Sequence, residues 1–286
     1  MRRAPRAVSS PDMKAMWMTG KLGMLLALLA AGGSAHAAEP APPAKSLEAD
    51  YTITWLGMPV YSGKFAIAWN GDRYRMRFQA EAEGIVRLAA NTVITWETTG
   101  RLAKGEIRPE RFEQANTFRR QTRRITLAYA EKGAPAVSVV PPESPGKRPA
   151  VPEPLKAGTL DPLSATFAAL SASLDRKSCG YTAKVFEGLR RTDVRLEHAG
   201  TERTPVHRVS GLDRQAFVCQ MHAKRLAGYE DKHFRQNPEP LPPATLWVAK
   251  HEGAGLWLPT QLRFESEYGP IYARLTRLKL SNGSGQ

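Results

Sequence analysis

Beyond residue 37, this chain contains five histidines and two cysteines, the side chains most often used for metal binding or nucleophilic chemistry. No two of these histidines lie four residues apart, as a zinc site on a helix requires, and none pairs with a cysteine at zinc-finger spacing. The chain also lacks the G-x-S-x-G nucleophile elbow, the phosphate-binding loop and the dinucleotide fingerprint. We therefore expect no metal centre and no cofactor. The histidines are His198, His207, His222, His233 and His251.

Carboxylates are the remaining candidates for acid–base chemistry. Glu81, Glu83, Glu97 and Asp193 fall in segments that alternate like strands, where successive side chains point to opposite faces. No spacing selects two of them as a general acid and a general base. The sequence therefore identifies no catalytic residue.

An export signal is the clearest feature of the N-terminal segment. Two lysines precede the uncharged apolar run 22–31, which is followed by Ala35-His36-Ala37, a small-residue cleavage site. We predict that residues 1–37 are a signal peptide and that a periplasmic protein begins at Ala38. The run is shorter than the roughly 20 residues that a membrane-spanning helix needs, so an uncleaved anchor is the less favoured alternative. We expect no transmembrane segment in the mature protein.

The chain is strongly basic. Its formal charge is +14, and removal of residues 1–37, which carry five basic and one acidic side chains, lowers this to +10. In an exported protein such an excess favours an anionic envelope surface, such as lipid headgroups or acidic polymers, over nucleic acid. The alternative is a solubilising cationic surface with no specific partner.

The two cysteines are Cys179 and Cys219. An even number of cysteines in an oxidising compartment indicates a disulfide. We predict a Cys179–Cys219 bridge, with two separate buried thiols as the alternative.

Period-two alternation dominates the first half of the chain and predicts half-buried strands. In 73–80 the arginines alternate with Tyr74, Met76 and Phe78, and in 65–69 the apolar side chains also share one face. The Asn70-Gly71-Asp72 link between these segments is a hairpin signal. Similar alternation from Tyr51 to Tyr129 predicts about seven consecutive strands and hence an antiparallel sheet.

A proline-rich connection, 141–158, separates these strands from the clearest helix. Asp161 suits the N-cap and Pro162 the first helical position, and apolar residues follow at helical spacing. Strand patterns resume after Cys179. Apolar residues of one helix face are Leu163, Phe167, Leu170 and Leu174.

These patterns predict a mainly β fold: a large curved antiparallel sheet, or half-open barrel, wrapped around one short amphipathic helix. We expect a disordered mature N-terminus at 38–47, a single β-rich domain at 48–282 with an exposed connection at 141–158, and a polar tail at 283–286. An outer-membrane barrel is disfavoured by the central helix and the proline-rich connection.

Several short motifs follow one another in the second half of the chain. They are Asp161-Pro-Leu-Ser-Ala165, Cys179-Gly180, Val185–Arg191 followed by Asp193, Cys219, Leu226-Ala-Gly-Tyr229, Leu258-Pro-Thr260 and Gly269–Arg274. Their order resembles the bacterial family called domain of unknown function 3108, over about residues 51–280. Glu187 and Leu189 depart from the family motif, where an aspartate and an arginine are expected. The resemblance implies a periplasmic, strongly curved sheet around a helix, similar to the half-barrels of lipoprotein carriers, and implies no established activity.

The segment 185–193 is expected to form a tight hairpin in which Gly188 adopts an unusual backbone angle. Arg190, Arg191 and Asp193 would then solvate the rim of the half-barrel. The alternative is that the two arginines form a rim site for an anionic headgroup.

Our leading hypothesis is a non-enzymatic envelope protein that binds a lipid or lipoprotein acyl chain in an apolar half-barrel. The alternative is an envelope assembly or scaffold protein whose core is filled by its own helix and whose basic surface binds an anionic partner. A hydrolase of envelope polymers comes third. The candidate ligand-binding residues are Trp55, Phe65, Trp69, Tyr74, Met76, Phe78, Phe167, Arg190 and Arg191.

Overall fold

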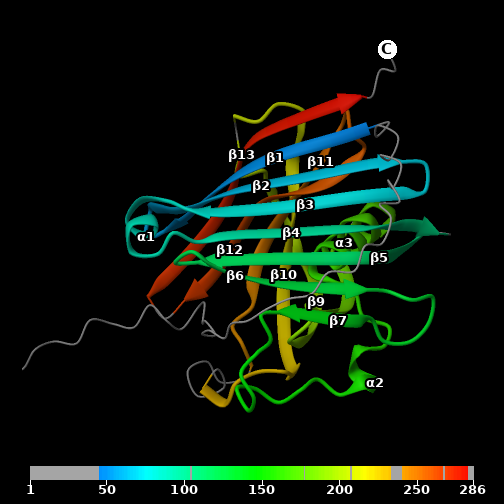
Figure 1. Ribbon diagram of the computed structural model, residues 1–286. Helices are drawn as coiled ribbons and strands as arrows, with labels where there is room; N and C mark the ends of the chain where they lie inside the picture. Colours follow the sequence, from blue (N-terminus) through cyan, green and yellow to red (C-terminus); the bar gives the residue numbers. More distant parts are fainter. Residues whose placement is uncertain are drawn as a thin grey trace, which may run out of the picture.

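The fold is built on one antiparallel sheet (Figure 1). The computed structural model describes residues 45–103, 105–176, 178–206, 208–232, 240–266 and 268–282, so the expected signal peptide and polar tail lie outside the described residues. The strands are β1 (Lys45–Trp55), β2 (Met58–Asn70), β3 (Arg73–Ala82), β4 (Val93–Ala103), β5 (Glu106–Phe118), β6 (Gln121–Ala128), β7 (Ala136–Val140), β8 (Gly180–Phe186), β9 (Arg191–Arg203), β10 (Leu212–Ala227), β11 (Ala244–His251), β12 (Leu256–Ser266) and β13 (Gly269–Asn282).

The order of strands across the sheet is β7-β6-β5-β4-β3-β2-β1-β13-β12-β11-β10-β9-β8. The two halves of the chain are therefore joined where β1 pairs with β13. The sheet does not close into a barrel, because β7 and β8 remain its two edges. The predicted mainly β, antiparallel architecture is confirmed.

The expected alternation in β3 decides which face is buried. Tyr74 and Met76 are buried while Arg73, Arg75 and Arg77 are exposed. Gly71 has a φ of +58° in the turn to β2, a conformation that glycine adopts without strain. The predicted hairpin between β2 and β3 is therefore confirmed.

The domain begins earlier than expected. Leu47 was assigned to the disordered N-terminus, but it is fully buried and lies in β1 opposite Leu280 and Ile67. The boundary at residue 48 was wrong because this leucine completes the apolar core between two strands.

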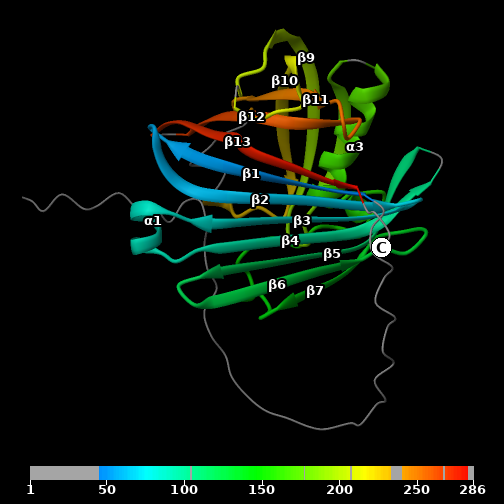
Figure 2. The ribbon, with the colours of Figure 1, turned by 90° about the horizontal axis from the view of Figure 1, so that it is seen from above.

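Three helices are described. Helix α3 (Pro162–Arg176) is the predicted amphipathic helix, and Figure 2 shows it in the angle between the β1–β7 part of the sheet and strands β9–β12. The side chains of Leu163, Phe167 and Leu170 are buried, whereas that of Leu174 lies outside the described part. The sequence did not predict the short helices α1 (Gly84–Ala89) and α2 (Glu153–Lys156).

The proline-rich connection is mostly exposed, as expected, but a few of its side chains are buried. Val151 belongs to the main apolar core, and Arg148 has only 9% of its side chain exposed. The segment also forms the short helix α2, in which proline stands in the first turn, where its missing N–H costs no hydrogen bond.

Candidate functional site

The concave face of the sheet and the buried face of α3 form one apolar cluster. Six of the nine candidate ligand-binding residues belong to it. Their side chains converge from β2, β3 and α3, and the ring of Phe167 contacts that of Tyr74 edge to face with centroids 5.4 Å apart. The six residues are Phe65, Trp69, Tyr74, Met76, Phe78 and Phe167.

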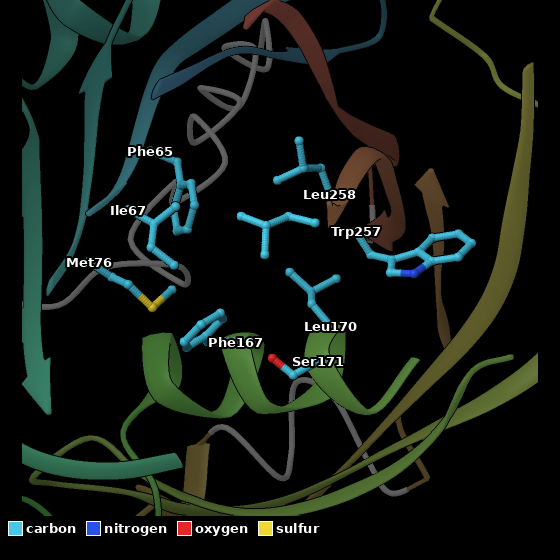
Figure 3. A pocket seen from close by; sticks show the side chains of 9 residues that line it. Phe65, Ile67, Met76, Phe167, Leu170, Ser171, Trp257 and Leu258 are labelled. Atoms are coloured by element: carbon cyan, nitrogen blue, oxygen red, sulfur yellow. The ribbon is translucent and has the colours of Figure 1, made fainter. Parts of the chain in front are cut away.

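Helix α3 nearly fills this face. Between Phe65, Ile67 and Met76 of the sheet and Phe167 and Leu170 of α3 there is a cavity of about 10 Å³ (Figure 3). Such a volume holds roughly one water molecule, whereas small-molecule pockets measure roughly 300–1,000 Å³. The helix therefore occupies the place where the lipid hypothesis puts an acyl chain.

Trp55 lies apart from this cluster. Its indole Nε1 donates a hydrogen bond to the backbone oxygen of Tyr268, 3.1 Å away, and the two rings contact edge to face. Both residues are at one end of the sheet. The expectation that Trp55 lines the concave face with Phe65 was wrong, because Trp55 is the last residue of β1 and is not part of the apolar cluster that contains Phe65.

A buried polar cluster surrounds the N-terminus of α3. Asp161 caps the helix as predicted, accepting from the Ser164 backbone N–H at 2.9 Å and from the Thr98 hydroxyl at 3.1 Å. The Ser164 hydroxyl lies 2.9 Å from the Tyr74 hydroxyl, and the buried Tyr129 hydroxyl has no hydrogen-bond partner among the described residues. Asp161 and Ser164 are fully buried, so this cluster fixes α3 rather than contacting a substrate.

Burial controls the ionisation of this cluster. Desolvation raises the pKa of Asp161 above that of an ordinary carboxyl, while its hydrogen bonds to Ser164 and Thr98 oppose the shift. Desolvation also raises the pKa of Tyr74 and Tyr129. All three groups therefore bind protons more tightly in the folded protein than in the unfolded chain.

The substitution Asp161→Asn tests this environment. Because folding raises the Asp161 pKa, its favourable contribution is present below the ordinary carboxyl pKa of about 4 and is lost as the pH rises through the raised value. Asparagine caps a helix as well as aspartate does. We expect the unfolding free energy of the variant, relative to that of the native protein, to increase from pH 4 to pH 7 in urea titrations. A difference that stays constant with pH would show that Asp161 is not desolvated.

The two candidate arginines do not form an open anion site. Arg191 has 2% of its side chain exposed and donates to the backbone oxygens of Leu155 and Thr192 and to the carboxylate of Asp193. Its predicted position at the solvated rim was therefore wrong. Residue spacing does not indicate this burial, because one acceptor, the Leu155 backbone oxygen, lies 36 positions away in α2.

Arg190 is paired within its own turn. Its Nε lies 2.9 Å from Glu187, whose carboxylate raises the Arg190 pKa, and its guanidinium lies over the ring of Tyr229. Gly188 has a φ of +100°, which confirms the predicted backbone angle. A carboxylate already occupies the position that an anionic headgroup would take on Arg190.

The seam between the two edges of the sheet is held by charged side chains that the sequence did not identify. Glu143 lies 3.0 Å from Arg123 of β6 and 2.6 Å from Arg148, and Arg148 also reaches Glu230 after β10 at 3.4 Å. Gln114 of β5 donates to Glu187 in the β8–β9 turn. These contacts join the β5–β7 edge to the β8–β10 edge and close the fold beneath α3.

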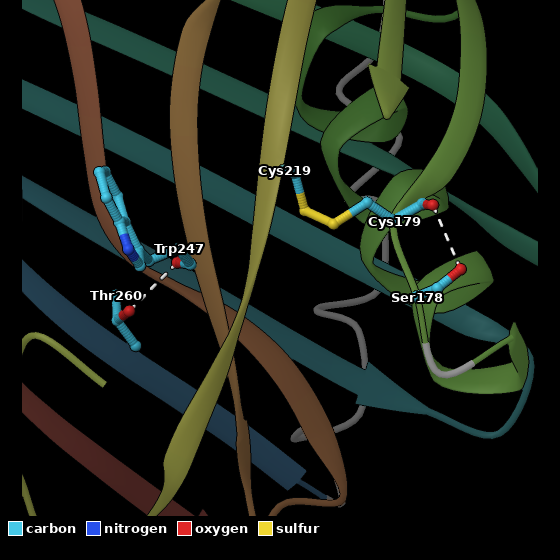
Figure 4. Close-up of a disulfide and its surroundings, with 5 residues drawn as sticks. All are labelled: Ser178, Cys179, Cys219, Trp247 and Thr260. Atoms are coloured by element: carbon cyan, nitrogen blue, oxygen red, sulfur yellow. Dashed lines mark hydrogen bonds between the residues drawn. A yellow bond between two sulfur atoms is a disulfide. The ribbon is translucent and has the colours of Figure 1, made fainter. Parts of the chain in front are cut away.

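The predicted disulfide between Cys179 and Cys219 is present (Figure 4). It joins the residue before β8 to β10, with the Cα atoms 5.6 Å apart. Both cysteines are buried in a second apolar cluster with Ala169 and Leu170 of α3. The bridge therefore supports the strands on which the C-terminal half of the helix packs.

The isolated histidines have ordinary partners. His222 lies 3.0 Å from Glu197, and the His251 Nδ1 accepts from the backbone N–H of Ala254. His207 and His233 lie outside the described residues. Across the described ranges, no three His, Cys, Asp or Glu side chains are grouped so that they could hold a metal. None of the helices described is both long and apolar enough to span a membrane.

The fold defines a half-barrel: one curved antiparallel sheet of 13 strands, not closed into a barrel, with α3 packed against its concave face. This chain belongs to the family described as protein of unknown function DUF3108, whose model matches residues 50–276. The expected family resemblance is thus confirmed.

Among the solved structures that are similar in fold is the "Beta-barrel-like Protein of Domain of Unknown Function DUF1849 from Brucella abortus". It is 12% identical, covers 84% of this chain and 99% of its own chain, and superposes with a TM-score of 0.49. A comparison with curated proteins finds no match.

Proposed function

We propose that this protein is a non-enzymatic periplasmic envelope protein whose own helix fills its half-barrel and whose basic exterior binds an anionic partner. The observation that carries this proposal is the cavity of about 10 Å³ between α3 and the sheet, which has no room for an acyl chain. The polar cluster around Asp161 and Ser164 holds the helix in that place.

Charge and compartment support the same proposal. The chain has a formal charge of +14, and the outer face of β3 exposes Arg73, Arg75 and Arg77. A disulfide is typical of an oxidising compartment, in agreement with the export signal expected at residues 1–37. An anionic envelope component is the partner that a basic exported surface attracts.

An acyl-chain carrier is the second candidate. It is favoured by the apolar lining of the small cavity, which includes Phe65, Met76 and Leu256. A chain could enter there only if Phe167 and Leu170 moved away from the sheet, which would expose the buried face of α3.

Binding measurements distinguish the two candidates. We expect no saturable binding of a fluorescent fatty acid at high micromolar concentrations. We expect binding to heparin, an acidic polymer, that weakens as salt is added, with neutral dextran as the control. Saturable fatty-acid binding that is weakened by Phe167→Asp, in a variant that still folds, would establish the carrier instead.

A further inference from the structure

One end of the sheet exposes large apolar side chains from three neighbouring connections. These are the turn between β1 and β2, helix α1 between β3 and β4, and the turn between β12 and β13, and all belong to consecutive strands of the sheet. Helix α1 and the β1–β2 turn lie together at the left of Figure 1. We call this set the apolar rim: Leu56 (58% exposed), Met58 (50%), Ile85 (68%), Leu88 (88%) and Tyr268 (53%).

Direct contacts hold these connections side by side. Trp55 joins the β1–β2 hairpin to Tyr268 through its hydrogen bond and ring contact, and the Leu56 side chain lies over Gly269. On the other side, the Glu83 backbone N–H donates to the oxygen of Val60 at 2.8 Å and fixes the start of α1 against β2. These contacts hold the three connections side by side at one end of the sheet.

Exposed arginines flank the apolar rim. Arg87 lies on α1, and Arg119 and Arg120 form the β5–β6 turn at the same end of the sheet. All three are exposed, and none forms a salt bridge with any residue in the described chain. The Arg119 guanidinium lies 5.3 Å from the centre of the Phe118 ring. This end of the molecule thus combines the exposed side chains of the apolar rim with arginines that form no salt bridge in the described part of the chain.

Backbone strain marks the same residues. Among the described residues, the non-glycine positions with positive φ are Leu56 (+50°), Arg119 (+47°) and Arg120 (+69°). They form two-residue hairpin turns, where Asn and Gly are the favoured residues and large side chains are strained. The chain therefore presents leucine and arginine at turn positions where its own folding favours other residues. Such departures from local preference are typical of functional surfaces.

We propose that the apolar rim and its three arginines dock on an anionic lipid bilayer. The apolar side chains would enter the boundary between headgroups and acyl chains, and the guanidinium groups would bind phosphates. Separate protruding turns suit a fluid bilayer, because each can insert independently. This inference rests on the proposed function and specifies its anionic partner as a membrane surface.

The test is co-sedimentation of the purified protein with vesicles. We expect binding to phosphatidylglycerol/phosphatidylcholine vesicles that weakens with added salt, and much weaker binding to pure phosphatidylcholine. The double variant Arg119→Asn/Arg120→Gly creates the favoured Asn-Gly turn, so it should melt at the same or a higher temperature than the native protein. Its affinity for the anionic vesicles should nevertheless fall by roughly 30-fold, since each of the two arginines near an anionic surface contributes about fivefold.

Two further variants complete the test. Leu56→Asn also relieves turn strain, and it should lower vesicle affinity by about tenfold through the lost apolar insertion. The matched control is Arg73→Gln/Arg214→Gln, which removes two exposed arginines near the other end of the strands. That end lies roughly 30 Å away along a ten-residue strand, beyond the Debye length, so the control should bind vesicles nearly as the native protein does.

The outcomes separate this inference from the proposed function. Two results would overturn the membrane inference and leave the proposed function standing. In the first, the Arg119→Asn/Arg120→Gly and Leu56→Asn variants bind anionic vesicles as tightly as the native protein does. In the second, the native protein does not bind the vesicles but binds heparin. A native protein that binds neither anionic vesicles nor heparin would overturn both.

Discussion

Replacement of Gly228 by alanine is expected to destabilise this protein by more than about 4 kcal/mol or to prevent its folding, a loss in the exceptional range for a single substitution. Gly228 has a φ of +80°, and a Cβ atom there would lie 1.9 Å from the backbone oxygen of Leu189 and 2.9 Å from Val151. The clash is with backbone, which cannot rotate away. It would force apart the β8–β9 turn and the segment that follows β10, and so open the seam beneath α3.

Alanine substitutions at two other glycines provide a comparison for the loss of stability expected at Gly228. Gly133 has a φ of +96° with nothing near its Cβ position, so Gly133→Ala should cost only about 1 kcal/mol of backbone strain. At Gly188 the Cβ would lie 2.3 Å from Cγ2 of Ile125, a buried β-branched side chain that can move only if the core around it repacks, so this loss should clearly exceed that of Gly133→Ala. If Gly133→Ala and Gly228→Ala lowered the free energy of unfolding equally in urea titrations, the close packing of Gly228 against the Leu189 backbone would be contradicted.

Reduction of the Cys179–Cys219 disulfide is expected to lower the free energy of unfolding by about 4 kcal/mol in the loop-entropy model. The bridge spans 40 positions and thereby restricts the unfolded chain. For a chain of this size the loss corresponds to roughly 10 °C in melting temperature. Thermal unfolding with and without reductant measures it.

The matched variant for the disulfide is Cys179→Ser/Cys219→Ser. It should melt near the temperature of the reduced native protein and should not respond to reductant. Alkylation of both thiols in the native, unreduced protein would show that no bridge forms.

The sequence predicted those features of the fold that depend on neighbouring residues. Tyr74 and Met76 alternate with exposed arginines, so one strand reveals its own buried face. Asp161 and Pro162 mark the start of α3 because capping is a local interaction. The prediction that the helix packs in the concave face followed from its apolar stripe, which needs a partner.

Contacts between distant residues could not be predicted in this way. Arg191 looks like a rim residue beside Arg190 and Asp193, yet it also donates to the Leu155 backbone oxygen in α2, a contact that the spacing of residues does not reveal. The ion pairs of Glu143 with Arg123 and Arg148 likewise depend on how the two sheet edges meet. Local sequence patterns do not show how these two edges of the sheet contact each other.

How completely α3 fills the half-barrel could not be predicted from the sequence either. Aromatic side chains such as Phe65 and Phe78 predicted an apolar face but not the distance from that face to Phe167. Only side-chain packing fixes that distance, and it leaves about 10 Å³. The apolar rim could not be predicted for a related reason, because the connections that carry Leu56, Leu88 and Tyr268 lie at the same end of neighbouring strands only through the strand order.

The most direct test of the filled half-barrel is native mass spectrometry of the protein purified from its own periplasm without detergent. We expect the mass of the chain from Ala38 with one disulfide and no bound lipid, since α3 occupies the concave face. A lipid retained one to one by the native protein, and lost from a folded Phe167→Asp variant, would contradict it.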